Sequence, residues 1–428
     1  MSTGRPLCHI AIGRSGVSAP TIGATEAGGG RAGGLLIRLC TTVVLAILAA
    51  TTAARAVDVE IVFLSRDQEE RLPLSFVDPI VEDPGVWGAR LALDDNKTTG
   101  GFLGHTYSLV ERVLTADEDI AVVFEEERQS GQTLFISDLP RDDLQAIAEH
   151  PEASEALIFN GRVGDDDLRI NVCFDNVFHT APSRSMRTDA LVQFLVWKRW
   201  PRLYLVSGTQ ENDVAFAEAI RRSAEKFGAQ VVAESDYAYS AISRRTDSGH
   251  IQIQDQMPLA TQEGGEYDVL IVADENEVFG EYLPYNTYAA RPVAGTHGLV
   301  AMSWHRVLEQ WGSTQIQRRF EQVADRWMEE RDYGAWLGVR SIGEAVTRLN
   351  SADAAEIRAF LRSPDFEIGG FKGVGLSYRS WDQQMRQPVL IANKRVLVSA
   401  SPQPGFLHER TPLDSLGYDE PESECRLQ

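Results

Sequence analysis

The sequence predicts an α/β protein made of two lobes, each built around a parallel sheet. Its 428 residues are more than one small core can organise, so two domains are expected. Short apolar runs alternate with amphipathic stretches of helical length, which is typical of parallel βαβ units. This alternation occurs twice, on either side of a crossover at Phe178–Arg184. Hydrophobic residues at 43% and charged residues at 24% fit a globular protein.

The first series of elements begins with Val59–Ser65, an apolar run suited to a buried parallel strand. A helix is expected at Gly85–Asn96 because its apolar residues share one face, and Gly100-Gly101 ends it. The next predicted elements are the strand Thr106–Arg112, the helix Asp117–Glu127, the strand Thr133–Ser137, the helix Asp142–His150 and the strand Ala156–Phe159.

The second series follows the crossover. It is expected to contain the helix Ala190–Arg199, the strand Arg202–Ser207, the helix Val214–Phe227 with Gly228 as its cap, and the strands Gln230–Glu234 and Tyr267–Ala273. Ser248–Thr261 is ambiguous, and Gly298–Trp304 is interpreted as a strand that returns to the first lobe. The last elements are the helices Gln315–Glu330, Gly334–Arg348 and Ala354–Leu361, and the short strands Leu376–Tyr378, Val389–Ile391 and Val396–Val398.

These elements set the expected domain boundaries. The first lobe comprises residues 57–180 and about 298–365, and the second lobe comprises residues 181–297 and about 366–400. Residues 401–428 are rich in proline and acids and are expected to form an extended tail.

The charge of the chain argues against nucleic acid as a partner. The formal net charge is −21, and residues 1–56 contain five arginines and one acid, so the remainder has 36 basic and 61 acidic residues, or −25. Such a surface repels nucleic acid and anionic membranes. No zinc-type spacing of cysteine and histidine suggests otherwise.

Residues 35–56 have the pattern of a secretory signal. Arg31 and Arg38 supply positive charge, and the apolar run from Leu39 to Ala50 is too short to span a bilayer. Ala54-Arg55-Ala56 is a small-residue cleavage site, so the mature chain is expected to begin at Val57 in the periplasm. The alternative is a retained anchor helix. Residues 1–34 are treated as an N-terminal extension outside the fold.

Export would leave two cysteines in the mature chain, Cys173 and Cys425. An even number in an oxidising compartment favours a disulfide, which would tie the C-terminal tail to the end of the first lobe. Two unpaired thiols are the alternative, because a sequence does not reveal the separation of the two Cα atoms.

The motifs of common enzymes do not occur. The sequence has no G-x-S-x-G elbow, no P-loop and no H-E-x-x-H segment. His179 and His297 lie in predicted loops without the further ligands that a metal needs, so they are interpreted as hydrogen-bonding residues near the crossovers. We therefore expect a binding protein rather than an enzyme, with no cofactor or metal.

Several segments resemble the type I periplasmic binding proteins of the leucine/isoleucine/valine-binding family. They are Gly88–Ala92 with Asp95-Asn96 and Gly100-Gly101, the crossover at Phe178, Asp332–Trp336 and Gly370–Gly373. The resemblance covers about residues 58–400 and rests on the order and spacing of these motifs. It implies two Rossmann-like lobes joined by a multi-stranded hinge, with a ligand held between them.

A closer resemblance is to a subfamily described as substrate-binding components of ABC transport systems associated with PQQ-dependent alcohol dehydrogenases. The similar segments are Arg245–His250, Ala273–Glu275, Arg291–Thr296, Ser363–Phe366, Pro404–His408 and Leu416–Asp419 with Cys425–Leu427. The resemblance implies a periplasmic partner of an ABC permease and ATPase, with a functional link to quinoprotein alcohol oxidation.

In such a fold the ligand lies outside the carboxyl ends of the parallel strands. The residues expected to contact it are Ser65, Arg66, Trp87, Arg162, His179, Arg184 and Asp274. Amino-acid binders of the family use hydroxyl groups after the fourth strand, whereas the loop here, 160–165, has no serine or threonine. They also pair the ammonium group with an aspartate at the position that corresponds to Arg184 here, so the ligand is not expected to be an ordinary amino acid.

Three arginines are the main candidates for binding. Arg66, Arg162 and Arg184 could together clamp an anion, because guanidinium groups bind carboxylates bidentately, and Trp87 could form an apolar wall. The alternative is that the arginines are solvated or paired on the surface and that Trp87 only packs in the core.

Three functions are compatible with these residues. The first is a solute receptor for an ABC importer, and the second is a periplasmic sensor or accessory protein that binds a metabolite or PQQ without transport. The third is a hydrolase or oxidoreductase on a binding-protein fold, although no enzyme motif in the sequence supports it.

Overall fold

The computed structural model describes residues 56–67, 81–238, 253–425 and 427, and residues 54–428 form one compact unit. The predicted signal segment up to Arg55 lies outside the described residues, as does the Ser248–Gln252 part of the ambiguous stretch. Within the described ranges, no helix combines the length and the apolar character needed to cross a membrane.

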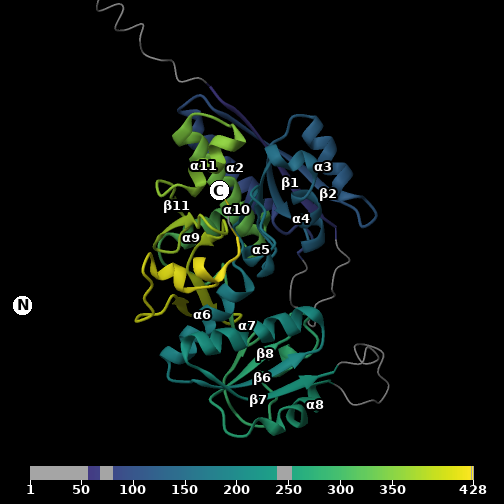
Figure 1. The fold of residues 1–428 in the computed structure, drawn as a ribbon, viewed down its shortest axis with the longest axis vertical. Helices are drawn as coiled ribbons and strands as arrows, with labels where there is room; N and C mark the ends of the chain where they lie inside the picture. The colour runs from purple at the N-terminus through teal and green to yellow at the C-terminus, as the bar shows by residue number, and fades with distance from the viewer. Residues whose placement is uncertain (1–55, 68–80, 239–252, 426, 428) are drawn as a thin grey trace, which may run out of the picture. The chain divides into compact units, whose positions relative to one another are not determined.

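The first sheet has five parallel strands in the order β2-β1-β3-β4-β5. Its strands β1 and β2 are labelled in Figure 1. The five strands are β1 (Asp58–Arg66), β2 (Thr106–Leu114), β3 (Leu134–Asp138), β4 (Leu157–Asn160) and β5 (Val177–His179). In β1, Ile61 and Phe63 belong to one hydrophobic cluster, whereas Val62 and Leu64 belong to another. Both faces of the sheet are therefore covered, which explains the continuous apolar run in this strand.

Helices cover the two faces of this sheet. They are α2 (Val86–Gly101), α3 (Ile120–Gln129), α4 (Arg141–Ala148), α5 (Asp167–Ile170), α9 (Ser313–Ala324), α10 (Glu330–Leu349) and α11 (Ala354–Arg362), with the short 3-10 helix η1 at Pro151–Glu155. The cluster behind Ile61 and Phe63 contains residues of α2, α9, α10 and α11, and the cluster behind Val62 and Leu64 contains residues of α3 and α4.

The second sheet has seven strands in the order β15-β14-β10-β9-β8-β6-β7. They are β6 (Arg202–Gly208), β7 (Gln230–Tyr237), β8 (Val269–Ala273), β9 (Val293–Gly295), β10 (Leu299–Met302), β14 (Val389–Ala392) and β15 (Leu397–Ser401). The strands from β7 to β10 are parallel, and β14 and β15 add antiparallel pairs at one edge.

The helices of the second lobe lie on both sides of this sheet. α7 (Glu211–Phe227) and α8 (Ile253–Ala260) lie above and below β6–β8 in Figure 1, and α6 (Arg184–Trp197) shares the cluster of α7. Two 3-10 helices follow α8, η3 (Gln262–Gly264) and η4 (Gly280–Tyr282). α6 begins six residues before the predicted start at Ala190 because Ser183 caps it, with its hydroxyl accepting a hydrogen bond from the Met186 N–H.

The expected return of the chain to the first lobe at Gly298 is wrong. β10 pairs with β9 and with β14, so it belongs to the second sheet. The next helix that packs on the first sheet after β10 starts only at Ser313. A four-residue apolar run fits either sheet, and the order of the strands is decided by pairing over long sequence distances.

The segment after α11 also differs from the expected boundary. β11 (Ile368–Gly369), β12 (Gly375–Tyr378) and β13 (Met385–Arg386) form a small antiparallel sheet whose buried side chains join the first hydrophobic cluster. The chain returns to the second sheet only at β14. Residues 366–386 therefore pack with the first lobe rather than the second.

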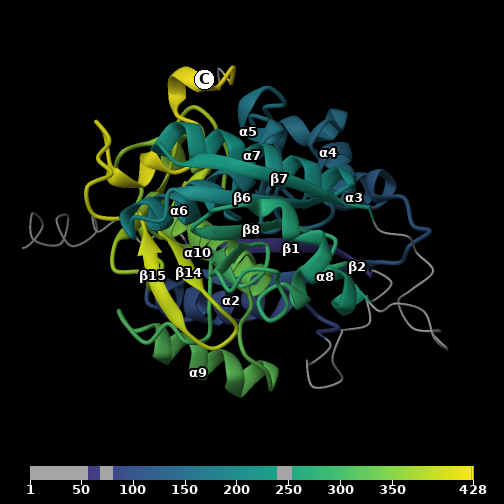
Figure 2. The same cartoon turned by 90° about the horizontal axis from the view of Figure 1, so that it is seen from below.

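The C-terminal tail is not simply extended. It contains the 3-10 helices η5 (Pro412–Ser415) and η6 (Glu420–Glu422), and Leu416 is buried in the core cluster of the second lobe. Cys425 near its end forms a disulfide with Cys173, with the two Cα atoms 5.6 Å apart. The tail ends near α5 (Figure 2).

Candidate functional site

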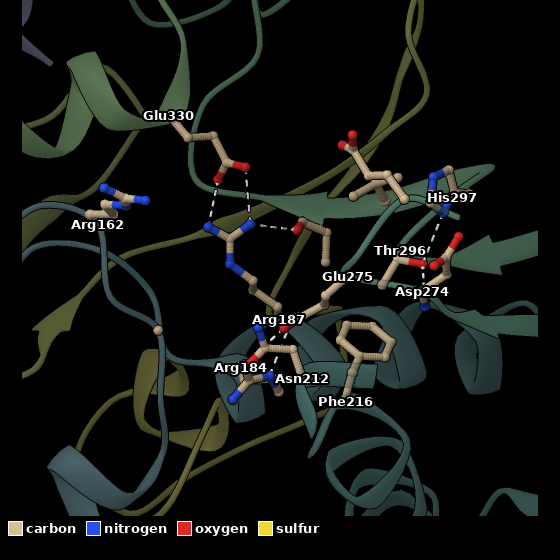
Figure 3. Close-up of a pocket in the computed structure, with 15 residues that line it drawn as sticks. Arg162, Arg184, Arg187, Asn212, Phe216, Asp274, Glu275, Thr296, His297 and Glu330 are labelled. Carbon is tan, nitrogen blue, oxygen red and sulfur yellow. Dashed lines mark hydrogen bonds and ion pairs between the residues drawn. The ribbon is translucent and has the colours of Figure 1, made fainter. Parts of the chain in front are cut away.

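A cavity of about 440 Å³ lies where strands of both sheets end. Its walls come from the loops after β4, β8 and β9 and from the first turns of α6, α7 and α10 (Figure 3). The lining residues are Arg162, Gly164, Arg184, Arg187, Asn212, Phe216, Asp274, Glu275, Glu277, Gly295, Thr296, His297, Val300, Ala301 and Glu330. The carboxyl ends of parallel strands and the amino ends of helices form the usual ligand crevice of an α/β protein.

Arg184 opens α6 and faces two carboxylates. Its Nε and Nη2 donate to Glu275 at 3.1 and 2.8 Å, and its Nη1 lies 3.5 Å from Asp165. Burial would lower the pKa of this guanidinium, but the hydrogen bonds and the negative charge of Glu275 outweigh burial and raise it. Because Glu275 belongs to the second lobe and Asp165 to the first, Arg184 joins the two lobes at the cavity wall.

Arg187 lies one turn further along α6 and forms a second ion pair. Its Nη1 donates to Glu330 at 3.0 Å and to the Ala301 carbonyl at 3.1 Å, and its Nη2 lies 2.9 Å from the other oxygen of Glu330. Burial alone would raise the pKa of Glu330, but the charge of Arg187 and hydrogen bonds from Ser303 hold it below its usual value. This pair also joins the lobes, because Glu330 begins α10.

Arg162 approaches the cavity from the first lobe. Its Nη1 donates to the Asp138 carbonyl at 3.3 Å, and the Asp138 carboxylate in turn accepts from Nε of Arg331 at 2.8 Å. Burial and the nearby charge of Arg331 lower the pKa of Arg162. Arg162 thus contributes a cation to the cavity wall from the first lobe, while Arg331 is held by the Asp138 carboxylate.

A close backbone contact positions the loop that carries Arg162. A Cβ atom on Gly334 of α10 would lie 2.4 Å from the Gly161 carbonyl oxygen, so only glycine allows the helix and the loop to meet there. Asn160 fixes the same loop with its side chain, which accepts hydrogen bonds from the N–H groups of Arg162 and Val163.

Asp274 lines the cavity but its carboxylate is already fully engaged. It accepts hydrogen bonds from the backbone N–H groups of Val278, Phe279 and Gly280 at 2.9, 2.8 and 2.6 Å. These contacts fold the loop after β8 back on itself. By holding the backbone of this loop, Asp274 fixes the shape of the cavity wall next to it.

The opposite wall offers neutral hydrogen-bonding groups and an apolar surface. The Thr296 hydroxyl lies 3.0 Å from Nδ1 of His297, and burial lowers the pKa of His297, which favours the neutral imidazole. Asn212 and Phe216, one turn apart at the start of α7, complete this wall. Figure 3 shows Arg162 and these residues on opposite sides of Arg187.

The structure brings together three of the seven predicted binding residues, Arg162, Arg184 and Asp274. Ser65 and Arg66 end β1 away from the cavity, and the Arg66 guanidinium contacts Asp143 at 2.5 Å and the Thr115 carbonyl at 2.6 Å. Arg66 therefore does not join the other two arginines in a clamp. β1 and β4 are separated by β3, and Arg66 turns toward α4 and the end of β2 instead.

Trp87 and His179 also lie elsewhere. Trp87 lines a different hollow of about 430 Å³ beside α2, β2 and α9, and the Arg90 guanidinium covers its ring at 4.2 Å. His179 is buried at the end of β5, where its Nδ1 lies 3.0 Å from the Asn160 amide nitrogen. This contact agrees with the expected hydrogen-bonding role near the crossover and keeps the ring out of the cavity.

Several lining residues were missed by the sequence-based reasoning. Arg187 follows Arg184 by three residues, so a correct start for α6 would have placed both on one helical face. Glu330 lies at a helix start that the predicted helix Gln315–Glu330 concealed, because α9 ends at Ala324. Among the described residues, no group of three or more His, Cys, Asp and Glu side chains could hold a metal ion.

Comparison with known proteins supports the same fold. Residues 73–251 match the family model described as "Periplasmic binding protein". A branched chain amino acid ABC transporter periplasmic ligand-binding protein from Burkholderia xenovorans LB400 is 13% identical, with a TM-score of 0.65 over 87% of this chain and 99% of that chain. A search of curated protein sequences finds no match.

Two further solved structures are similar over most of this chain. The leucine-, isoleucine-, valine-, threonine-, and alanine-binding protein from Brucella ovis is 13% identical, with a TM-score of 0.60, and covers 87% of this chain and 98% of its own. A solute binding protein from R. palustris in complex with benzoate is 11% identical, with a TM-score of 0.57, and covers 87% of this chain and 100% of its own.

The described chain has the two-lobed fold of the type I periplasmic binding proteins. The predicted fold, two α/β lobes with parallel sheets in the type I arrangement, is confirmed.

Proposed function

We propose that this protein is the periplasmic substrate-binding component of an ABC-type transport system and that it holds a small organic anion in the 440 Å³ cavity. One observation carries the proposal: the cavity is lined from both lobes and three arginines contribute to its walls. Closure of two lobes around a bound solute is the usual mechanism of proteins with this architecture.

The charges of the cavity support an anion bound mainly by Arg162 and Arg187. Arg184 has its Nε and Nη2 on Glu275 and its Nη1 toward Asp165, so carboxylates already surround it. Arg187 uses Nη1 and Nη2 for three contacts, but a guanidinium has five N–H donors. A ligand carboxylate can therefore accept from Arg187 while Arg162 supplies a second cation.

The rest of the cavity suits a short ligand with both polar and apolar parts. Thr296, His297 and Asn212 offer hydrogen bonds to hydroxyl or carbonyl groups, and Phe216 with Val300 offers apolar contact. A short hydroxylated or aromatic carboxylate satisfies this combination. One solved relative in fold has benzoate in its complex, which makes aromatic carboxylates worth testing.

The proposal includes a link to PQQ-dependent alcohol oxidation, which rests on the resemblance of the segments 245–250, 291–296 and 404–408 to proteins of such systems. Oxidation of alcohols yields aldehydes and then carboxylates, the chemical class that the arginines favour. The alternative is a periplasmic sensor or accessory protein that binds PQQ itself, a tricarboxylate, without transport. Cleavage near Ala56 and residence in the periplasm belong to the same proposal.

A thermal-shift screen tests the proposal. Short carboxylates, aromatic carboxylates, alcohols, amino acids and PQQ are compared, and a ligand at 100 times its Kd stabilises the folded state by about 2.7 kcal/mol. We expect a carboxylate to stabilise the protein and Arg162→Met to abolish that effect. Arg66→Met is the matched control, because Arg66 ends a strand of the same sheet without lining the cavity.

Equal stabilisation of the wild type and Arg162→Met by the same carboxylate would overturn the assignment of the site. Stabilisation by PQQ alone would favour the sensor over the transport component. Stabilisation only by amino acids would contradict the anion proposal.

A further inference from the structure

The C-terminal segment 402–425, here named the strap, is attached to the second lobe at its middle. Gly417 donates its N–H to Asp189 of α6 at 2.8 Å, and its carbonyl accepts from Lys226 of α7 at 2.7 Å and from Arg222 at 3.1 Å. Asp189 is fully buried, and Leu416 beside it belongs to the core cluster of the second lobe. Backbone and side-chain contacts thus fix this part of the strap to α6 and α7.

The end of the strap is attached to the first lobe. Glu424 donates its N–H to the Ile170 carbonyl at 2.7 Å, and the Ser423 hydroxyl donates to the Arg169 carbonyl at 2.8 Å. The disulfide from Cys425 to Cys173 makes this attachment covalent. All three contacts are to α5 or to the residues directly after it.

A third attachment lies between these two. Arg379, buried in the turn after β12, donates to Asp414 at 3.0 Å and to the carbonyls of Leu416 and Tyr418 at 2.6 and 3.1 Å. β12 packs with the first hydrophobic cluster. The strap is therefore held continuously from the second lobe to the first.

Both attachment regions stand directly behind the walls of the cavity. α5 begins three residues after Gly164, which lines the cavity, and Asp189 follows Arg187 by two residues on α6. The strap thus ties the wall that carries Arg162 to the wall that carries Arg187. Displacement of one wall from the other requires the strap to detach or stretch.

In the part of the chain that the structure describes, three other segments connect the lobes, namely 180–183, 303–312 and 387–388. We propose that the strap is a fourth connection, closed by the disulfide, which limits how far the lobes separate and so restricts the width of the cavity. Its effect on ligand exchange rests on the proposed function, but the mechanical restraint itself is independent of any ligand.

The Ser303 N–H provides a readout at a distance from the strap. Ser303 follows β10 of the second sheet and donates its N–H to Glu330 at the start of α10, so its amide is protected only while the lobes are in contact. We expect hydrogen exchange of this amide in the Cys173→Ser/Cys425→Ser variant to be about tenfold faster or more than in the oxidised wild type. Amides of Ile61–Leu64 in β1 should keep their protection, which shows that the fold is intact.

Glu420→Gln is the matched control, because the Glu420 carboxylate pairs with Arg410, another residue of the strap, and its loss leaves the attachments to both lobes in place. It should leave exchange at Ser303 unchanged. If the double serine variant does not fold, the folded wild type is compared before and after reduction with TCEP. Faster exchange confined to residues 412–424, with Ser303 unchanged, would overturn the proposal and leave the strap a local packing element.

Discussion

The two cavity arginines of α6 are each paired with a glutamate. Arg184 and Arg187 each hold a glutamate with two N–H groups, and in each case the pairing offsets the desolvation of both charges. Removal of one partner would leave the other charge unpaired and at least partly buried, so single substitutions here disturb the fold as well as binding. Arg162 lines the same cavity from the first lobe, so its substitution tests binding at the opposite wall.

His179 should make the protein sensitive to mild acid. Burial, together with the charge of Arg169, holds the pKa of His179 well below its usual value. As the pH falls below about 6.5 the unfolded chain takes up a proton at this residue and the folded chain does not, so stability declines by up to about 1.4 kcal/mol per pH unit. Above that pH the histidine is neutral in both states and this contribution to the pH dependence vanishes.

The variant His179→Gln should therefore show a shallower loss of stability between pH 7 and pH 5 than the wild type. Urea unfolding at several pH values measures both slopes. His297 and His305, whose pKa values are also lowered by burial, remain in the variant and keep part of the slope. Identical slopes for the variant and the wild type would contradict this account of His179.

Helix α10 organises the first lobe through its glycines. Gly334 meets the loop after β4, Gly338 meets Ile136 and Phe159 of the sheet, and Gly343 meets Asn96 of α2. In each case an added Cβ would come within 3.0 Å of its neighbour. The helix can therefore touch the sheet and α2 at once, and its first residue, Glu330, is held at the cavity.

Gly334→Ala should destabilise the protein, because the new methyl group would lie 2.4 Å from the carbonyl oxygen of Gly161. Overpacking of this kind typically costs about 1–3 kcal/mol, and the displaced loop carries Arg162. Chemical unfolding measures the loss of stability. Gly101→Ala, at the end of α2 with no atom within 4 Å of the new Cβ, is the control and should be neutral or slightly stabilising. Equal effects of the two variants would show that the close approach at Gly161 does not matter.

The crossover between the lobes is held by buried glutamines. Gln384 donates to the carbonyls of His179 and Ala181 at 3.2 and 3.0 Å, and its own carbonyl accepts from Arg169 at 3.0 Å. Gln387 donates to the Thr180 carbonyl at 2.7 Å and accepts from Lys372 at 2.7 Å. The carbonyls of this crossover are therefore satisfied by glutamine side chains, whereas its N–H groups donate to the backbone carbonyls of Asn160 and Gln383.

The disulfide ties together parts of the chain that are 252 residues apart, so it restricts the unfolded state strongly. Removal of a native disulfide typically costs about 2–5 kcal/mol. We expect Cys173→Ser/Cys425→Ser to unfold at a lower guanidinium concentration than the oxidised protein. An unchanged midpoint would show that the strap contributes little to global stability, whatever its effect on the lobes.

Local sequence patterns were sufficient to predict the alternation of strands and helices, the crossover at Phe178 and the two-lobed α/β fold. Val59–Ser65 and Tyr267–Ala273 could be recognised because Ile61–Leu64 and Val269–Ala273 are buried on both faces and are therefore apolar without alternation. The pairing of Cys173 with Cys425, which the sequence favoured, is present in the structure. These features depend on residues close in sequence or on simple counting.

The tertiary structure decided which arginines face the cavity and which carboxylates hold them. Arg66 and Arg162 both lie at the carboxyl ends of strands of one sheet, yet only Arg162 lines the cavity, because β1 and β4 are not neighbours. The placement of β10 in the second sheet and the burial of the tail likewise depend on contacts between residues far apart in sequence. Side-chain partners across such distances are fixed by the order of strands and the path of the chain, which no local periodicity encodes.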